Sequence, residues 1–398
     1  MQTYISNKAK SISPSPTLSL DAKYKQMKKD GIPVVGFGAG EPDFNTPDNI
    51  KAAAVKAIEE NITKYTPASG TVELKKAICK KFKDDHGLDY GIENIVVSNG
   101  GKHSLTNIFM AICDDGDEVI IPTPFWVSYP EMVKMAGGVP TFLETTEEDG
   151  FKFTPEALES CITTKTRALV LNTPSNPTGM VYPEETLKKI AEIAVKHGIY
   201  VIMDEIYEKL VYEGSHKNIA TFGEDIKNLT ITVNGMAKAY AMTGWRIGFT
   251  ASNADVAKAM SNIQSHATSN PNSIAQAASV EALLGDQESV SLMRAEYIKR
   301  RDYMVERINS IDGISCLKPN GAFYIFMNVK KLLGTERYGK VFNTASELCD
   351  DILERALVAM VPSEGFGIDG YVRLSYATSM ENIKEGLDRI EKYIKNLY

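Results

Sequence analysis

The chain has 398 residues, which suits two domains better than one small module. Hydrophobic residues make up 43% and charged residues 24%, as in folded globular proteins, so disorder is excluded as the main state. The 44 basic and 51 acidic residues give a net charge of −7, so no general affinity for nucleic acid or anionic membranes is expected, and no apolar run is long enough to span a bilayer.

The cysteines and histidines give no sign of a metal site. The five cysteines are scattered and form no C-x-x-C pair, so neither a disulfide framework nor a thiolate metal site is expected. The five histidines contain no H-x-x-x-H pair, so no metal is predicted. Residues 1–10 are polar and lack the apolar core of a signal peptide, so a cytoplasmic location is expected.

The middle of the chain alternates between strand and helix patterns. Short apolar runs rich in β-branched residues predict strands at 95–97, 118–121, 168–171, 200–203, 229–233 and 247–250. Amphipathic helix patterns lie between most of them, for example Leu105, Ile108, Phe109 and Ile112. This alternation predicts an α/β fold, with a mostly parallel sheet sandwiched by helices in a large domain.

The C-terminal third has a different pattern. It contains a long helix pattern, three strand patterns and a final helix, at 289–309, 322–327, 358–361, 372–375 and 383–397, the last with Leu397 on its apolar stripe. We predict a smaller α+β domain, completed by a strand near residues 34–37. The predicted division is an N-terminal arm with part of the small domain (1–44), a large domain (45–288) and a small C-terminal domain (289–398).

Polar and special turn residues follow the predicted parallel strands. These strand ends carry the segments 98–102, 122–126, 172–179, 204–207 and 234–238. Because ligands bind beyond the carboxyl ends of parallel strands, these segments predict one functional site at one edge of the sheet. Gly100 and Gly101 start a helix there, which suits either an anion site or an ordinary tight turn. It is no Walker loop, since His103 follows Lys102.

Three further residues at this edge allow two interpretations each. Lys238 suits either a surface lysine or an amine that binds an aldehyde, which requires a pKa lowered by burial and by a nearby cation such as Arg246. Asp204 ends an apolar strand, so it is either a helix cap or a buried carboxylate with a cationic partner such as a protonated ring nitrogen. Trp126 is either a core residue or an aromatic plate for a flat ring.

An ordered set of motifs resembles the class I/II aminotransferases, which depend on pyridoxal 5′-phosphate (PLP) and have fold type I. The motifs are NPTG at 176–179, DEIY at 204–207 and KAYAMTGWRIG at 238–248. Four more are similar to bacterial aspartate aminotransferases of the Ib type: GEPDF at 40–44, Tyr65, PFWVSYP at 124–130 and YVRLSYAT at 371–378. The resemblance runs from about residue 13 to residue 392.

The resemblance implies a role for each residue around the cofactor ring. Lys238 would form the aldimine with PLP and later carry a proton to and from the substrate. Asp204 would hold the proton of the ring nitrogen. Asn176 and Tyr207 would donate hydrogen bonds to the phenolate oxygen of the ring, and Trp126 would stack on its face. The peptide bonds Thr123–Pro124 and Asn176–Pro177 are expected to be cis, as is common in the family.

The resemblance also implies a phosphate site and a dimer. Gly101, the Lys102 backbone and Arg246 would bind the phosphate, with one contact fewer than in relatives that have Ser in place of Ala237. Tyr65 would reach the phosphate of the neighbouring subunit, which implies a homodimer with shared sites.

For the substrate, the resemblance implies two carboxylate sites. Arg373 and the Gly40 backbone would bind the α-carboxylate, while Asn176 and Trp126 would also contact the substrate. In the Ib subgroup, Lys102, Thr17 and Ser15 match the residues that bind a second carboxylate. The partner-chain arginine of the Ia subgroup has no match in residues 266–270.

These features imply a ping-pong transamination of L-aspartate and 2-oxoglutarate to oxaloacetate and L-glutamate. Prephenate is a less expected substrate, because relatives that use it have a lysine where this chain has Ser13. The alternatives are an aminotransferase for aromatic, alanine or kynurenine-type amino acids, a PLP-dependent β-lyase, and a regulatory sensor without catalysis.

Overall fold

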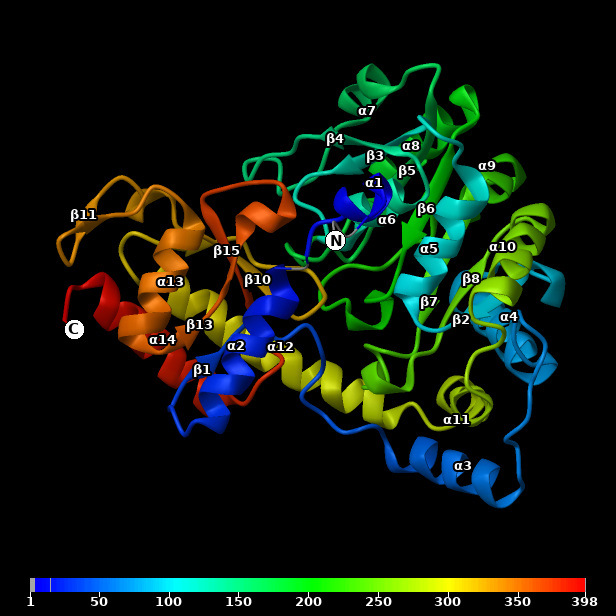
Figure 1. Cartoon of the computed structure of the whole chain (residues 1–398), viewed down its shortest axis with the longest axis horizontal. Coiled ribbons are helices and arrows are strands. Elements are labelled where there is room, and N and C mark those ends of the chain that lie inside the picture. The colour runs from blue at the N-terminus through cyan, green and yellow to red at the C-terminus, as the bar shows by residue number, and fades with distance from the viewer. Residues whose placement is uncertain (1–3, 15, 398) are drawn as a thin grey trace.

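The computed structural model describes residues 4–14 and 16–397. Its ribbon forms two bodies joined by the long helix α12 (Glu288–Asn309), as Figure 1 shows. The larger body holds the central sheet, and the smaller one holds the C-terminal strands and helices together with α2 (Pro16–Lys29). In the part of the chain that the structure describes, no helix combines the length and apolar character needed to cross a membrane.

The larger body is built on a seven-stranded sheet. In spatial order its strands are β2 (Ile95–Ser98), β8 (Gly248–Ala251), β7 (Thr230–Gly235), β6 (Tyr200–Asp204), β5 (Thr166–Asn172), β3 (Glu118–Pro122) and β4 (Val139–Leu143). Only β8 runs antiparallel to its neighbours, so the predicted mostly parallel sheet is confirmed. All six predicted strands are present. Strand β4 was missed, because it is a partly exposed edge strand without a continuous apolar run.

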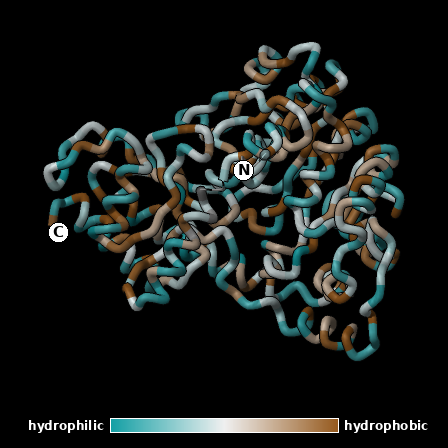
Figure 2. The backbone as a smooth tube through the Cα atoms, viewed as in Figure 1, coloured by the Kyte–Doolittle hydropathy of each residue, from teal (hydrophilic) through white to brown (hydrophobic). Residues whose placement is uncertain are grey.

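Helices cover both faces of this sheet. One face packs against α5 (Gly101–Ile112), α6 (Ser128–Met135) and α10 (Ala254–Ala267), and the other against α7 (Pro155–Cys161), α8 (Glu184–His197) and α9 (Glu224–Leu229). Helices α3 (Asp48–Glu59), α4 (Val72–His86) and α11 (Ser273–Leu284) pack near the β2–β8 edge. Hydrophobic and hydrophilic residues alternate along most helices (Figure 2), as expected for helices that bury one side.

The smaller body has its own sheets and core. Its main antiparallel sheet is ordered β14 (Val361–Pro362), β15 (Tyr371–Ser375), β10 (Tyr324–Asn328) and β9 (Ser315–Cys316). Two small pairs are β1 (Val35–Gly36) with β13 (Val358–Ala359), and β11 (Glu336–Arg337) with β12 (Lys340–Val341). Its remaining helices are α13 (Ala345–Ala356) and α14 (Met380–Ile394). Helix α1 (Asn7–Lys10) lies with the larger body instead, and the Ser13 N–H that follows it donates to Glu131 of α6 at 2.9 Å.

The small α+β unit completed by an N-terminal strand is as predicted, because Val35 pairs with Val358. One detail of the prediction was wrong. Helix α14 ends at Ile394, and Leu397 lies beyond it with 67% of its surface exposed, so Leu397 does not extend the buried stripe. The domain boundaries at residues 44 and 288 stay a prediction.

Candidate active site

A cavity of about 460 Å³ is lined by residues of the sheet's carboxyl edge and of the smaller body. From the larger body come the segments that follow β2, β5, β6 and β7, and from the smaller body come Tyr324 of β10 and Arg373 of β15. Eleven predicted site residues line it: Thr17, Gly40, Gly101, Lys102, Trp126, Asn176, Asp204, Tyr207, Lys238, Arg246 and Arg373.

Two predicted site residues are not among the lining residues that the structure describes. Tyr65 lies outside the cavity, and 91% of its surface is exposed. Its predicted contact is with the site of a second subunit, which one chain does not test. Ser15 falls outside the described residues.

The start of α5 and the turn before β8 form an anion-binding corner. Gly100 precedes the helix with φ of +90°, and a Cβ at this position would collide with the guanidinium of Arg246. The Arg246 guanidinium is held in place by its Nη1, which donates to the Thr243 carbonyl oxygen at 2.9 Å. The free N–H groups at a helix start, together with a guanidinium, provide donors for a phosphate or carboxylate. The anion-site interpretation of Gly100 and Gly101 therefore fits this geometry.

Lys238 has an amine with altered basicity. Burial lowers its pKa from 10.5 to about 8, and the positive charges of Arg373 and Arg246 act in the same direction, while Glu41 opposes them. The Lys238 ammonium donates to the Gly40 carbonyl oxygen and lies 5.9 Å from the centre of the Tyr207 ring. The interpretation of Lys238 as a plain surface lysine is wrong, because its amine points into the cavity.

Asp204 ends β6 as a buried carboxylate, 5% exposed. Its Oδ2 accepts a hydrogen bond from the Tyr129 hydroxyl at 2.7 Å, and its Oδ1 accepts one from the Ile206 N–H at 3.1 Å. Burial raises the pKa of Asp204 to about 6, although both hydrogen bonds lower it. A carboxylate held in this way has a strong preference for a cationic hydrogen-bond donor.

Arg373 closes the side of the cavity that belongs to the smaller body. Its Nη1 donates to Asn176 Oδ1 at 3.0 Å, its Nη2 donates to the Gly38 carbonyl oxygen at 3.0 Å, and the guanidinium lies 4.4 Å from the centre of the Tyr324 ring. The buried Nε of Arg373 has no hydrogen-bond partner among the described residues. The Tyr324 hydroxyl is 2.9 Å from the Tyr207 hydroxyl, which joins the two bodies across the cavity.

Lys102 lies at the start of α5 beside Trp126. Its Nζ is 5.0 Å from the centre of the Trp126 ring. Burial lowers the pKa of Lys102, and the positive charge of Arg246 lowers it further. Thr17 of α2 lines the same cavity. A cation is thus available near the predicted ring plate, and no carboxylate among the described residues forms an ion pair with it.

Sequence reasoning missed two aromatic residues of the site. Tyr129 lies in the first turn of α6, inside the same PFWVSYP motif as Trp126, and its place in that motif is the signal that could have revealed it. Tyr324 lies in an alternating strand pattern that predicts its burial but not its contact with Tyr207. The predicted cis bonds Thr123–Pro124 and Asn176–Pro177 are confirmed, and Thr173–Pro174 is also cis.

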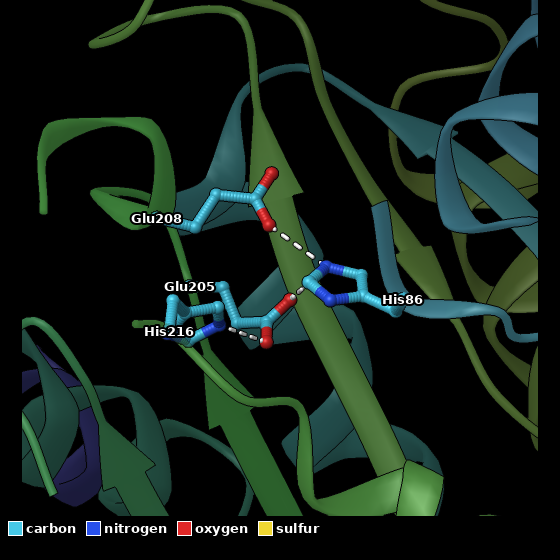
Figure 3. Close-up of side chains that lie close together, drawn as sticks. All are labelled: His86, Glu205, Glu208 and His216. Atoms are coloured by element: carbon cyan, nitrogen blue, oxygen red, sulfur yellow. Dashed lines mark hydrogen bonds and ion pairs between the residues drawn. The ribbon is translucent and has the colours of Figure 1, made fainter. Parts of the chain in front are cut away.

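A second cluster of ionisable side chains lies outside the cavity and includes Glu205, the residue that follows Asp204. His86, Glu205, Glu208 and His216 place one ligand atom each within 4.8 Å of the others, an arrangement that could hold a metal ion (Figure 3). These residues come from the end of α4, the turn after β6 and the following loop. Glu205 and Glu208 are three residues apart, but no local spacing connects them to His86 and His216, so sequence reasoning missed this cluster.

The fold and the site agree with comparisons to known proteins. The family model for aminotransferase class I and II matches residues 32–390. The aspartate aminotransferase of Bacillus sp. (strain YM-2) is 46% identical over 99% of this chain and 100% of its own. A probable aspartate/prephenate aminotransferase of Rickettsia bellii is 47% identical over 98% of each chain.

Solved structures give the same result. The aspartate aminotransferase from Rhizobium meliloti superposes with a TM-score of 0.96 at 43% identity, covering 99% of this chain and 100% of that one. The Thermus thermophilus aspartate aminotransferase with maleate gives 0.93 at 42% identity, covering 98% and 100%. With its fold, motifs and full-length relatives in agreement, the chain belongs to the class I and II aminotransferases.

Proposed function

We propose that the protein is a PLP-dependent enzyme that transfers the amino group of L-aspartate to 2-oxoglutarate, giving oxaloacetate and L-glutamate. One observation carries this proposal: an amine with a pKa of about 8, Lys238, and a buried carboxylate, Asp204, line the same cavity. An aldehyde cofactor whose ring nitrogen is protonated matches both groups.

The residues present fit PLP at three places. Asp204 is buried and accepts hydrogen bonds from two neutral donors, so a ring N–H⁺ would supply a positive partner for its carboxylate. The corner of Gly101 and Arg246 offers backbone N–H groups and a guanidinium to a phosphate. Trp126 lines the same cavity and offers a flat face for a ring.

Bound PLP would supply an aldehyde carbon for the amino group and a ring that withdraws electrons from the substrate Cα. Lys238 would hold the cofactor and then move a proton on and off the substrate, a task that suits a pKa near the working pH. Asp204 would keep the ring nitrogen protonated. Asn176 and Tyr207 would donate hydrogen bonds to the ring oxygen.

Arg373 would bind the substrate α-carboxylate. Its guanidinium lies in the cavity and carries a buried Nε without a partner, so it has donor capacity to spare. A fork of two N–H donors matches a carboxylate in charge and in geometry. The Gly40 backbone lies at the same wall and would complete this contact.

The choice of a dicarboxylic substrate rests on Lys102 and on the relatives. Lys102 and Thr17 line the cavity. The pKa of Lys102 is lowered by burial and by the positive charge of Arg246. Several full-length relatives at about 46% identity are named aspartate aminotransferase. The Thermus thermophilus structure holds maleate, a four-carbon dicarboxylate. Ser15 is proposed to assist Lys102, as the resemblance implies.

The direct test is an assay of the purified protein loaded with PLP. L-Aspartate and 2-oxoglutarate are expected to give oxaloacetate and L-glutamate in equal amounts, with parallel double-reciprocal plots because the two half-reactions alternate. L-Alanine, L-tyrosine and L-kynurenine serve as competing donors. Release of ammonia and pyruvate without an oxo acid would indicate a β-lyase and would contradict the proposal.

Prephenate is a second candidate acceptor, because the Rickettsia bellii relative at 47% identity is named for both aspartate and prephenate. Against it stands Ser13, where the prephenate branch has a lysine according to the resemblance. The same assay with prephenate in place of 2-oxoglutarate distinguishes the two. We expect kcat/KM for prephenate to be lower.

A Lys102→Ala variant tests the second carboxylate site. We expect kcat/KM for aspartate to fall by about ten- to a hundred-fold relative to that for alanine, because a charge-assisted hydrogen bond contributes about 1.5–3 kcal/mol. The matched control is Lys188→Ala, which removes an exposed lysine on α8. An unchanged ratio of aspartate to alanine would exclude Lys102 from this role.

The homodimer with shared sites and the cytoplasmic location stay predictions. The exposure of Tyr65 is compatible with a contact to a second subunit. The apolar residues Val55 and Ile58 on α3 are also more than half exposed, which suits the same interface.

A further inference from the structure

The segment from Asp204 to Glu208 has two sides with different tasks. Asp204 and Tyr207 line the cavity, whereas Glu205 and Glu208 belong to the buried cluster of Figure 3. Glu205 is fully buried and Glu208 is 9% exposed. Neither glutamate has a place in the proposed chemistry, so their burial requires another explanation.

Each glutamate has partners from neighbouring elements. Glu205 Oε1 accepts hydrogen bonds from His216 Nε2 at 2.5 Å and from Asn218 Nδ2 at 3.0 Å. Its backbone N–H donates to the Val233 carbonyl oxygen of β7 at 2.9 Å. Glu205 is therefore held by the loop after β6 and by the next strand of the sheet.

Glu208 is held from the other direction. Lys81 Nζ of α4 lies 2.5 Å from Glu208 Oε1, Asn234 Nδ2 of β7 donates to the same oxygen at 2.8 Å, and His86 Nε2 donates to Oε2 at 3.0 Å. Burial raises the pKa of Glu208, but Lys81 and His86 outweigh it and hold the pKa well below its usual range. Glu208 is thus an anion within a set of donors that already fits it.

The cluster already contains its own cations, which argues against a metal ion. The Lys81 ammonium occupies one oxygen of Glu208, and both imidazole Nε2 atoms point at carboxylate oxygens. Burial lowers the pKa of His216, but Glu205 outweighs it and raises the pKa, which favours the charged imidazole. A divalent ion would have to displace these contacts and would lie beside an ammonium group.

We propose that Glu205 and Glu208, with Lys81, His86 and His216, form a buried clamp that fixes the backbone of residues 204–208 and thereby positions Asp204 and Tyr207 at the cofactor. These are positioning residues, because none of the five lines the cavity. The inference rests on the proposed function for its link to PLP, but the rigidity of the segment is independent of it. Removing one clamp residue is expected to loosen both cavity side chains together.

The test compares Glu205→Ala with Glu205→Gln. The glutamine keeps an oxygen that accepts from His216 and Asn218, whereas the alanine removes it. In the apoprotein, hydrogen exchange of the peptide that covers residues 204–208 is expected to be about tenfold faster in the alanine variant and to rise less in the glutamine variant, which keeps the acceptor oxygen but loses the charge. The PLP dissociation constant of the alanine variant is expected to rise by about tenfold, with partial rescue by glutamine.

The matched control is Glu159→Ala, because Glu159 also pairs with a lysine and a histidine, Lys196 and His197, but at the surface. It is expected to leave both measurements unchanged. If Glu205→Ala does not fold, His216→Ala replaces it, since this variant removes a donor to Glu205 without changing the segment itself. The same direction is expected, with a smaller effect.

Three results would overturn the clamp. The first is wild-type exchange and PLP affinity in folded Glu205→Ala, and the second is an equal loss in the glutamine variant. The third is one equivalent of zinc in the dialysed wild type, measured by elemental analysis, that is lost in His86→Ala and in His216→Ala. A wild-type chain that fails to bind PLP would instead refute the proposed function. The exchange measurement on the apoprotein would still test the clamp.

Discussion

Replacing Lys238 by alanine is expected to abolish transamination, with a loss of at least about 10⁴-fold in kcat. The reason is that one amine serves both as the attachment point of the cofactor and as the group that moves a proton, and acid–base catalysis alone contributes about 10²- to 10⁴-fold. After borohydride reduction, mass spectrometry of the wild type should place the cofactor on the peptide that contains residue 238. The variant should carry none.

The pH dependence of cofactor capture tests the same amine. Only the neutral amine attacks an aldehyde, so the rate of PLP capture by the apoprotein should rise with pH through about 8, where Lys238 loses its proton. Since the positive charge of Arg373 lowers this pKa, Arg373→Met should move the midpoint upward. Fixation of the cofactor on another lysine, or a midpoint near 10.5, would contradict the role given to Lys238.

An Asp204→Asn variant is expected to lose about 150- to 4,000-fold in kcat/KM for aspartate. Asparagine keeps a hydrogen-bond acceptor but removes the charge, and loss of one partner from a buried ion pair costs about 3–5 kcal/mol. Steady-state kinetics in the presence of saturating PLP measure the effect. Because PLP is saturating, weak cofactor binding would not account for the loss.

Tyr129→Phe is the matched control for Asp204. It leaves the carboxylate in place and removes one hydrogen bond of 2.7 Å, so a smaller loss is expected. The Tyr129 hydrogen bond lowers the pKa of Asp204, so its removal should raise that pKa above about 6. Full activity of Asp204→Asn would show that the charge of Asp204 is not needed.

The sequence predicted the architecture well where local patterns are strong. Buried parallel strands such as β5 and β6 read as continuous apolar runs, and the site segments follow them directly, so their meeting at one edge was predictable. The edge strand β4 was missed because it alternates weakly and contains Pro140. Leu397 was misplaced because an apolar periodicity does not mark where a helix ends.

Contacts between distant segments were beyond sequence reasoning. The hydroxyl pair of Tyr207 and Tyr324 joins two bodies, and nothing in either local pattern connects them. The same applies to His86 and Glu208, which meet only because α4 packs beside the end of β6. Burial of a polar residue is visible in a sequence, but its partner is decided by tertiary packing.

The antiparallel strand β8 has a consequence for synthesis of the chain. Strand β2 pairs with β8, through Ser98 opposite Gly248, and no other described strand adjoins β2. During synthesis, β2 and the turn at Gly100 therefore leave the ribosome long before β8, and β2 has no strand to pair with until Ala251 has emerged. Lys238 and Arg246 also emerge at this late stage, so the cavity lacks this amine and this guanidinium until the chain has been made almost as far as β8.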